Sequence, residues 1–199
     1  MNTNKLYHNN LIKEVGKQEL EVNNFEAYSV EILIDFLKVS HQRFINQSIP
    51  KIEQNFLMLV KYFDENNDLK TLFKLFLKFQ IDFKQHIAIE EKTIFPYSEV
   101  LHKASISSSM ETILLIHFSK YSISDFVSSH ENNECYLTEI IFLLVQQDAL
   151  KDHPVYNILL KQICQFDNEL KTHGWVEDNV LVKKVEEIEK AITDFVKKD

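Results

Sequence analysis

Apolar residues recur at intervals of three and four along most of the chain, the spacing typical of α-helices that bury one face. The first strong pattern begins near Ala27. Its apolar stripe contains Val30, Ile34, Leu37, His41 and Phe44. Pro50 interrupts the pattern, which resumes at Ile52 and continues to Phe63. Because proline removes one backbone hydrogen bond from a helix, we expect a kink or a break there.

Further helices are predicted from Asp68 to about Pro96, from Met110 to about Ser129 and from Tyr136 to Val145. The last predicted helix starts at the segment Asp152 to Pro154 and carries Ile158 to about Val196. Polar segments separate these patterns, and Asp68 and Asp152 are suited to cap the helices that follow them. The chain has only two glycines and three prolines, too few for the frequent turns of an all-β protein. The pattern therefore predicts an all-α protein. We expect residues 1–26 to form an arm or short helix, residues 27–199 to form a four-helix bundle, and the segment from Tyr136 to Val145 to be an extra short helical insert.

Two of the predicted helices carry the same stripe, with a constant offset of 87 residues. The first stripe consists of Leu72, Phe76, Phe79, Phe83, His86, Glu90 and Ile94. The second consists of Leu159, Ile163, Phe166, Leu170, His173, Glu177 and Leu181. Residues four apart lie one above the other on a helix face, so each His–Glu pair is expected to point where its stripe points, toward the core.

A buried imidazole or carboxylate is costly unless it is paired or binds a metal. His41 and His117 lie on the apolar stripes of the two remaining long helices. Four histidines and two glutamates thus converge from four helices, the way in which metal sites are assembled in bundle cores. The candidate metal ligands are His41, His86, Glu90, His117, His173 and Glu177.

The HxxxE motif alone is a weak signal, because a chain of this composition contains about one by chance. A third copy, His130 with Glu134, lies in a polar segment without an apolar flank, and we expect it to be exposed and metal-free. The pairs His86–Glu90 and His173–Glu177 differ from this third copy because each of them lies within a seven-residue apolar stripe. The alternative interpretation of these pairs is two internal His–Glu hydrogen bonds without metal.

Composition narrows the function classes. A net charge of −8 argues against a nucleic-acid partner, which would need clustered Lys and Arg. No charge-free run is long enough to span a bilayer, and the polar first ten residues do not resemble a secretory signal. Cys135 and Cys164 form no CxxC pair, so we expect reduced thiols in a cytoplasmic protein.

Six nitrogen and oxygen ligands without a thiolate favour a hard-to-borderline metal with more than four coordination positions. Two shared carboxylates suit two metal ions that they bridge. Ferritin-like di-iron bundles use Glu-x-x-His, which is the reverse order and a different spacing. The residues alone therefore predict a carboxylate-bridged pair of metal ions.

Three segments together resemble the hemerythrin-like HHE family, over about residues 28–190. They are SHQRF (40–44) followed by Ile49–Pro50, HIAIEEKTIFP (86–96), and LKTHGWVEDNVL (170–181). The ligand set is most similar to the branch that repairs iron centres, and the resemblance implies an up-down four-helix bundle with two non-haem iron ions. That branch usually has Glu-His-Asp in the third helix, where this chain has Ile116, His117 and Phe118. Oxygen-carrier hemerythrins have a second histidine where this chain has Tyr121, and the cysteine-pair domain common in repair proteins has no counterpart in residues 1–26.

The resemblance implies iron–sulfur cluster repair or a nitric oxide or oxygen stress response, with a diatomic ligand (NO or O₂) or a damaged iron–sulfur protein as partner. The alternative is a module that binds or senses O₂ or NO without catalytic turnover. A third interpretation is a metal-free helical interaction protein. Whether the chain is an enzyme stays open at this point.

Overall fold

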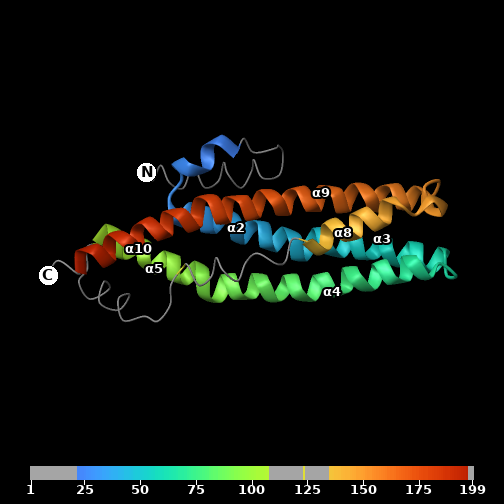
Figure 1. Ribbon diagram of the computed structural model, residues 1–199, viewed down its shortest axis with the longest axis horizontal. Helices are drawn as coiled ribbons and strands as arrows, with labels where there is room; N and C mark the ends of the chain where they lie inside the picture. Colours follow the sequence, from blue (N-terminus) through green and yellow to red (C-terminus); the bar gives the residue numbers. More distant parts are fainter. Residues whose placement is uncertain (1–21, 108–122, 124–134, 197–199) are drawn as a thin grey trace. The chain divides into compact units, whose positions relative to one another are not determined.

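The computed structural model describes residues 22–107, 123 and 135–196 (Figure 1). These residues form helices and the turns that join them, and no strand occurs among them. The all-helical composition is consistent with a helical bundle and confirms the predicted fold class at that level. No helix in the described part of the chain is long and apolar enough to cross a membrane.

The elements follow one another in this order. A 3₁₀ turn, η1 (Val22–Ala27), precedes α2 (Val30–Arg43), the π-helical turn η2 (Phe44–Ser48) and α3 (Ile49–Tyr62). Next come α4 (Asn67–Ile89), the π-helical turn η3 (Glu90–Ile94) and α5 (Phe95–Ser107). After the gap lie α8 (Cys135–Val145), the 3₁₀ turn η4 (Asp148–Leu150), α9 (Pro154–Val176), the π-helical turn η5 (Glu177–Leu181) and α10 (Val182–Val196). The helix predicted from Met110 to Ser129 lies outside the described residues, apart from Ile123, and so do residues 1–21 of the predicted arm.

The helix starts are capped by residues other than those predicted. The Oδ1 atom of Asn66 accepts a hydrogen bond from the Leu69 amide at 2.9 Å, so Asn66 caps α4 in place of Asp68. At α9 the Nδ1 atom of His153 accepts a hydrogen bond from the Val155 amide at 3.3 Å, in place of Asp152. Pro154 occupies the first position of α9, where its missing N–H costs nothing.

The expected disturbance at Pro50 is a π-helical turn. Directly before it, the Ile49 amide donates to the Phe44 carbonyl five residues earlier. Pro50 then lies in the first turn of α3. Prolines and π turns are the usual causes of irregular helix paths, and here the two occur together.

The 87-residue repeat extends to the backbone. The segments α4, η3 and α5 begin at residues 67, 90 and 95, and α9, η5 and α10 begin 87 positions later, at residues 154, 177 and 182. Each series places a π turn at the glutamate of its His–Glu pair. The two stripes therefore share a helix geometry as well as a residue pattern.

The described residues fall into two compact units. The first contains residues 22–40, 90–107, 123 and 172–196, and the second contains residues 41–89 and 135–171. In the first unit α5 packs against α10. Its apolar core is built by Phe25, Val30, Leu33, Ile34, Phe36, Leu37, Ile94, Phe95, Leu101, Ala104, Ile123, Val176, Val180, Leu181, Val182, Val185 and Ile192.

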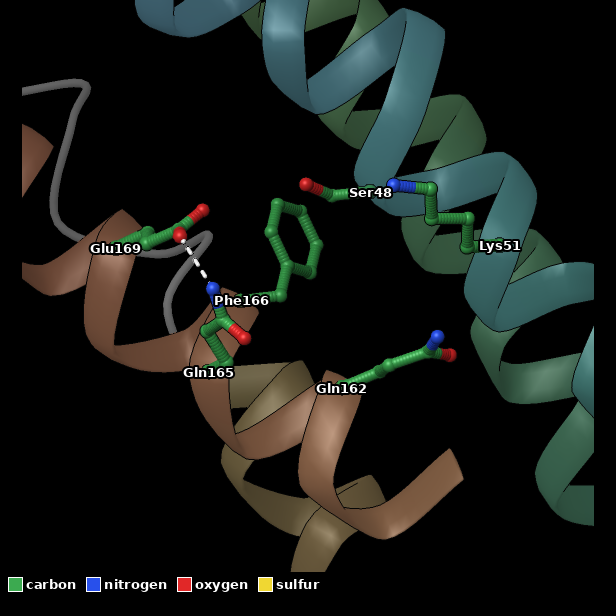
Figure 2. Close-up of a pocket in the computed structure, with 6 residues that line it drawn as sticks. All are labelled: Ser48, Lys51, Gln162, Gln165, Phe166 and Glu169. Carbon is green, nitrogen blue, oxygen red and sulfur yellow. Dashed lines mark hydrogen bonds between the residues drawn. The ribbon is translucent and has the colours of Figure 1, made fainter. Parts of the chain in front are cut away.

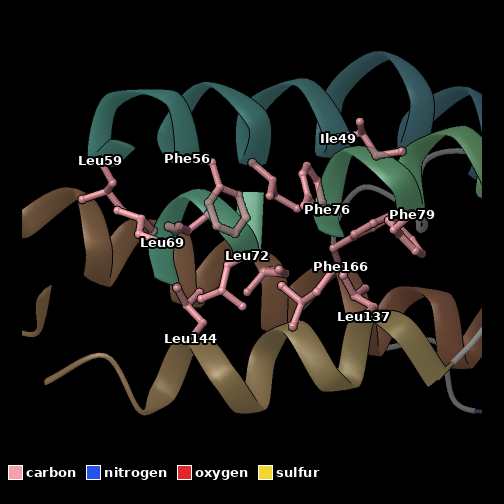
Figure 3. Close-up of a cluster of buried hydrophobic side chains, with 14 of the residues drawn as sticks. Ile49, Phe56, Leu59, Leu69, Leu72, Phe76, Phe79, Leu137, Leu144 and Phe166 are labelled. Atoms are coloured by element: carbon pink, nitrogen blue, oxygen red, sulfur yellow. The ribbon is translucent and has the colours of Figure 1, made fainter. Parts of the chain in front are cut away.

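The second unit has an aromatic core between α3, α4, α8 and α9 (Figure 3). The Phe56 and Phe76 rings stack with centroids 5.3 Å apart, and the Phe79 and Phe83 rings do so at 5.5 Å. The segment predicted as an extra insert is α8, which packs against α4. Because α8 contributes the fully buried residues Leu137, Ile140 and Leu144, it is part of this core.

Candidate metal centre

The two predicted carboxylate ligands are the first residues of two π turns. Glu90 begins η3 and Glu177 begins η5. Both are fully buried, with 0 % of their surface exposed. In η5 the Val182 amide donates to the Glu177 carbonyl, the five-residue step that defines a π turn. Such turns are rare and occur often at functional sites.

His173 lies in the last turn of α9, one helical turn before Glu177. It is 7 % exposed, and its Nε2 atom lies 3.9 Å from Oε2 of Glu177. Ligand atoms of Glu90 lie within 4.8 Å of one of His173 and of one of Glu177. The first unit therefore gathers two carboxylates and an imidazole in one buried cluster, which we call the Glu–His–Glu cluster.

The two carboxylates of the Glu–His–Glu cluster lie close together in a buried site. Two carboxylates less than 5 Å apart repel each other, and burial removes the water that would screen them. A shared proton, an imidazolium or a metal ion can offset the repulsion. The oxygen and nitrogen donors suit hard-to-borderline divalent ions, a class that includes iron.

His41 and His86 belong to the second unit. His41 follows Ser40 directly in α2 and is fully buried. His86 lies in the last turn of α4, is half-buried, and its ring stacks on that of Phe83 with centroids 6.5 Å apart. The helical path continues without a break from α4 into η3, so His86 lies one turn before Glu90 on the same helix.

The remaining predicted ligand, His117, lies outside the described residues, together with its neighbours Ile116 and Phe118. The third motif copy, His130 with Glu134, also lies outside them. Of the six predicted ligands, the structure thus describes five, and it gathers Glu90, His173 and Glu177 within one unit.

No cysteine among the residues that the structure describes belongs to the Glu–His–Glu cluster. Cys164 is half-buried in the second unit. Burial raises the pKa of its thiol, and the nearby Asp167 carboxylate raises it further. A thiol with a raised pKa is ionised to a smaller extent at neutral pH than an ordinary cysteine.

The π turns are the part of the site that the stripe did not predict explicitly. A signal was present, because each stripe ends in two consecutive steps of four, from His86 to Ile94 and from His173 to Leu181. A regular α-helix alternates steps of three and four to keep one face in line. Two successive steps of four need a wider turn, which a π turn supplies.

Comparison with known proteins gives no relative: no protein-family model, no curated protein and no solved structure matches the chain.

Proposed function

We propose that the chain is a non-haem di-iron protein of the hemerythrin-like kind. In this proposal His41, His86, His117 and His173 hold the two iron ions, and Glu90 and Glu177 bridge them. The iron pair would supply binding of a diatomic ligand or redox chemistry. The protein residues would fix the ions, offset their charge and limit water.

The observation that carries the proposal is the Glu–His–Glu cluster. Two fully buried glutamates and a buried histidine, from two different helices, place their ligand atoms within a few ångströms of one another. A fold that needed only packing would fill these positions with apolar residues, because buried charged groups are costly. The repeated π turns at both glutamates support the same interpretation.

The proposed role is iron–sulfur cluster repair or a response to nitric oxide or oxygen stress, with damaged iron–sulfur proteins as partners. This part rests on the resemblance of the three motifs to the branch that repairs iron centres. The second candidate is a module that binds or senses O₂ or NO without turnover. The departures at Ile116 and Phe118 favour it, because acidic partners that would orient His117 are missing from both neighbouring positions.

A reactivation assay separates the two candidates. An iron–sulfur enzyme inactivated by nitric oxide is incubated with the iron-loaded chain, and recovery of its activity is followed. Repair predicts recovery that depends on the dose of the chain and is lost in the Glu177→Ala variant. If the fully loaded chain binds nitric oxide but restores no activity, repair is wrong and the binding function remains.

A further inference from the structure

The second unit contains a pocket that the proposed metal centre does not use. It lies between α3 and α9 and has a volume of about 150 Å³ (Figure 2). Its lining residues are Ser48, Lys51, Gln162, Gln165, Phe166 and Glu169. Pockets for drug-sized ligands are usually larger, roughly 300–1,000 Å³, so this one is suited to a molecule of only a few heavy atoms.

The carboxylate of Glu169, the acidic group of the pocket, already interacts with two other side chains. Oε1 of Glu169 accepts a hydrogen bond from the Gln165 amide at 3.0 Å, and Oε2 lies 3.3 Å from the Arg43 guanidinium. The carboxylate is therefore neutralised and fixed from two directions. It adds little repulsion toward an anionic ligand and has few lone pairs left for a cationic one.

The donors of the pocket are not engaged in the same way. Lys51 makes no ion pair or hydrogen bond with any residue in the described part of the chain. Oε1 of Gln162 accepts from the Asn55 amide at 2.7 Å, which holds the side chain and leaves its own NH₂ group to donate. The Ser48 hydroxyl, at the end of η2, is a further donor.

The buried ring of Phe166 separates the two sides. It projects from α9 into the pocket, with Gln162 on one side of it and Glu169 on the other (Figure 2). Phe166 is only 1 % exposed, so its ring is held firmly by the second core. The pocket thus combines an unpaired ammonium, an amide donor and a hydroxyl, and it is bordered by the edge of a buried aromatic ring.

We propose that this pocket binds a small monocarboxylate, with the carboxylate accepting from Lys51 and Gln162 and the short carbon chain against Phe166. Charge-assisted hydrogen bonds are about twice as strong as neutral ones, so we expect Lys51 to contribute most to the affinity. A single ammonium matches a single negative charge better than the double charge of phosphate. The Oε1 atom of Gln165 remains as an acceptor and suits a hydroxyl group on the ligand, so a 2-hydroxy acid fits better than a plain fatty acid.

The test is an NMR titration of the full chain with L-lactate, after chelator treatment and dialysis so that metal-bound lactate does not contribute. We expect saturable shifts of the Gln162 side-chain amide, with a dissociation constant in the millimolar range. Lys51→Gln should weaken this binding at least tenfold, whereas Lys161→Gln, at the exposed neighbour of Gln162, should leave it unchanged. Ser48→Ala should weaken it a few-fold.

Two comparison ligands complete the test. Lactamide, which lacks the negative charge, should not bind, and inorganic phosphate should bind more weakly than lactate. Shifts that do not saturate, or equal binding by the Lys51→Gln variant with an unchanged circular dichroism spectrum, would overturn the proposal. Equal binding of phosphate or lactamide would overturn the assignment to carboxylates.

Discussion

The two units differ in what their cores contain. The second unit buries a mostly apolar set, beside the polar residues His41 and Gln80. Phenylalanine rings contact one another in it, including Phe44, Phe56, Phe76, Phe79, Phe83 and Phe166. The first unit buries Glu90, His173 and Glu177 beside its apolar residues. The segment formed by α4, η3 and α5 passes from the second unit to the first at Glu90, and the segment formed by α9, η5 and α10 does so at Thr172. Each of these two segments therefore contributes to both cores.

We infer from this difference that the second unit mainly stabilises the fold, whereas the first unit carries the Glu–His–Glu cluster. Apolar burial contributes roughly 25 cal/mol per Å², whereas buried charged groups lower stability unless a partner compensates them. The aromatic core of the second unit is therefore expected to stabilise the chain without metal. The Glu–His–Glu cluster of the first unit is expected to cost stability until a cation is bound.

The largest expected effect comes from the aromatic core. Phe76 is fully buried, so Phe76→Ala should lower the free energy of unfolding by about 3–5 kcal/mol, through lost apolar contact and a remaining cavity. Urea denaturation measures this change. The control is Phe142→Ala, since Phe142 is 64 % exposed on α8 and its loss should cost less than about 0.5 kcal/mol. Equal losses in the two variants would contradict the stabilising role of the buried aromatic core.

The next effect concerns the metal dependence of the first unit. With free iron at about 100 times its dissociation constant, the wild-type chain should gain about 2.7 kcal/mol of stability. The Glu177→Gln variant should gain less than about 1 kcal/mol, because one carboxylate ligand is lost. Thermal unfolding with and without iron measures both gains, with Glu187→Gln, at an exposed position of α10, as the matched control.

Without metal, we expect Glu177→Gln to have the opposite effect on stability. Glutamine keeps the shape of the side chain and removes one of two buried carboxylates, so metal-free Glu177→Gln should be at least as stable as the metal-free wild type. A clear loss of stability in the metal-free variant would instead indicate that Glu177 serves a structural hydrogen-bond network.

A smaller effect is expected away from the cluster in the first unit. The Tyr97 hydroxyl donates to Oε1 of Glu189 at 2.6 Å. Tyr97→Phe should lower the free energy of unfolding by about 0.5–1.5 kcal/mol, the usual contribution of one hydrogen bond. Iron content should stay unchanged, and a loss of iron in this variant would show that the effect of Glu177 is not specific.

The smallest effect is kinetic. Because burial raises the pKa of Cys164, a smaller fraction of its thiol is ionised at pH 8 than in an exposed cysteine. In a Cys135→Ser background, iodoacetamide should alkylate Cys164 a few-fold more slowly than a free cysteine peptide. The rate should also continue to rise at pH values where the peptide has reached its plateau. Equal rates and equal pH profiles would contradict the burial of this thiol.

Much of the fold could be predicted from the sequence because apolar spacing reports helices directly. The stripes from Leu72 to Ile94 and from Leu159 to Leu181 fall on helical segments, and Glu90, His173 and Glu177 are buried as their places in the stripes predicted. The caps were predicted wrongly, because several polar residues adjoin each helix start and only the backbone path selects Asn66 and His153.

Other features could not be predicted from spacing alone. The segment from Tyr136 to Val145 was correctly predicted as helical, but its part in the second core depends on contacts with distant residues of α4. The pocket beside Phe166 has no sequence motif, since its donors come from helices more than 100 residues apart in sequence. The identity of the metal stays a prediction, because imidazole and carboxylate ligands suit several divalent ions.

The metal content of the chain purified after growth in iron-supplemented medium, without metal added later, tests the central claim most directly. Quantification by mass spectrometry should give about two iron ions per wild-type chain, the number that a carboxylate-bridged bundle site holds. Iron should fall to near zero in Glu90→Gln/Glu177→Gln, and His130→Ala should retain the wild-type amount. A folded wild-type chain without metal above background, or a double variant that keeps all its iron, would contradict the account.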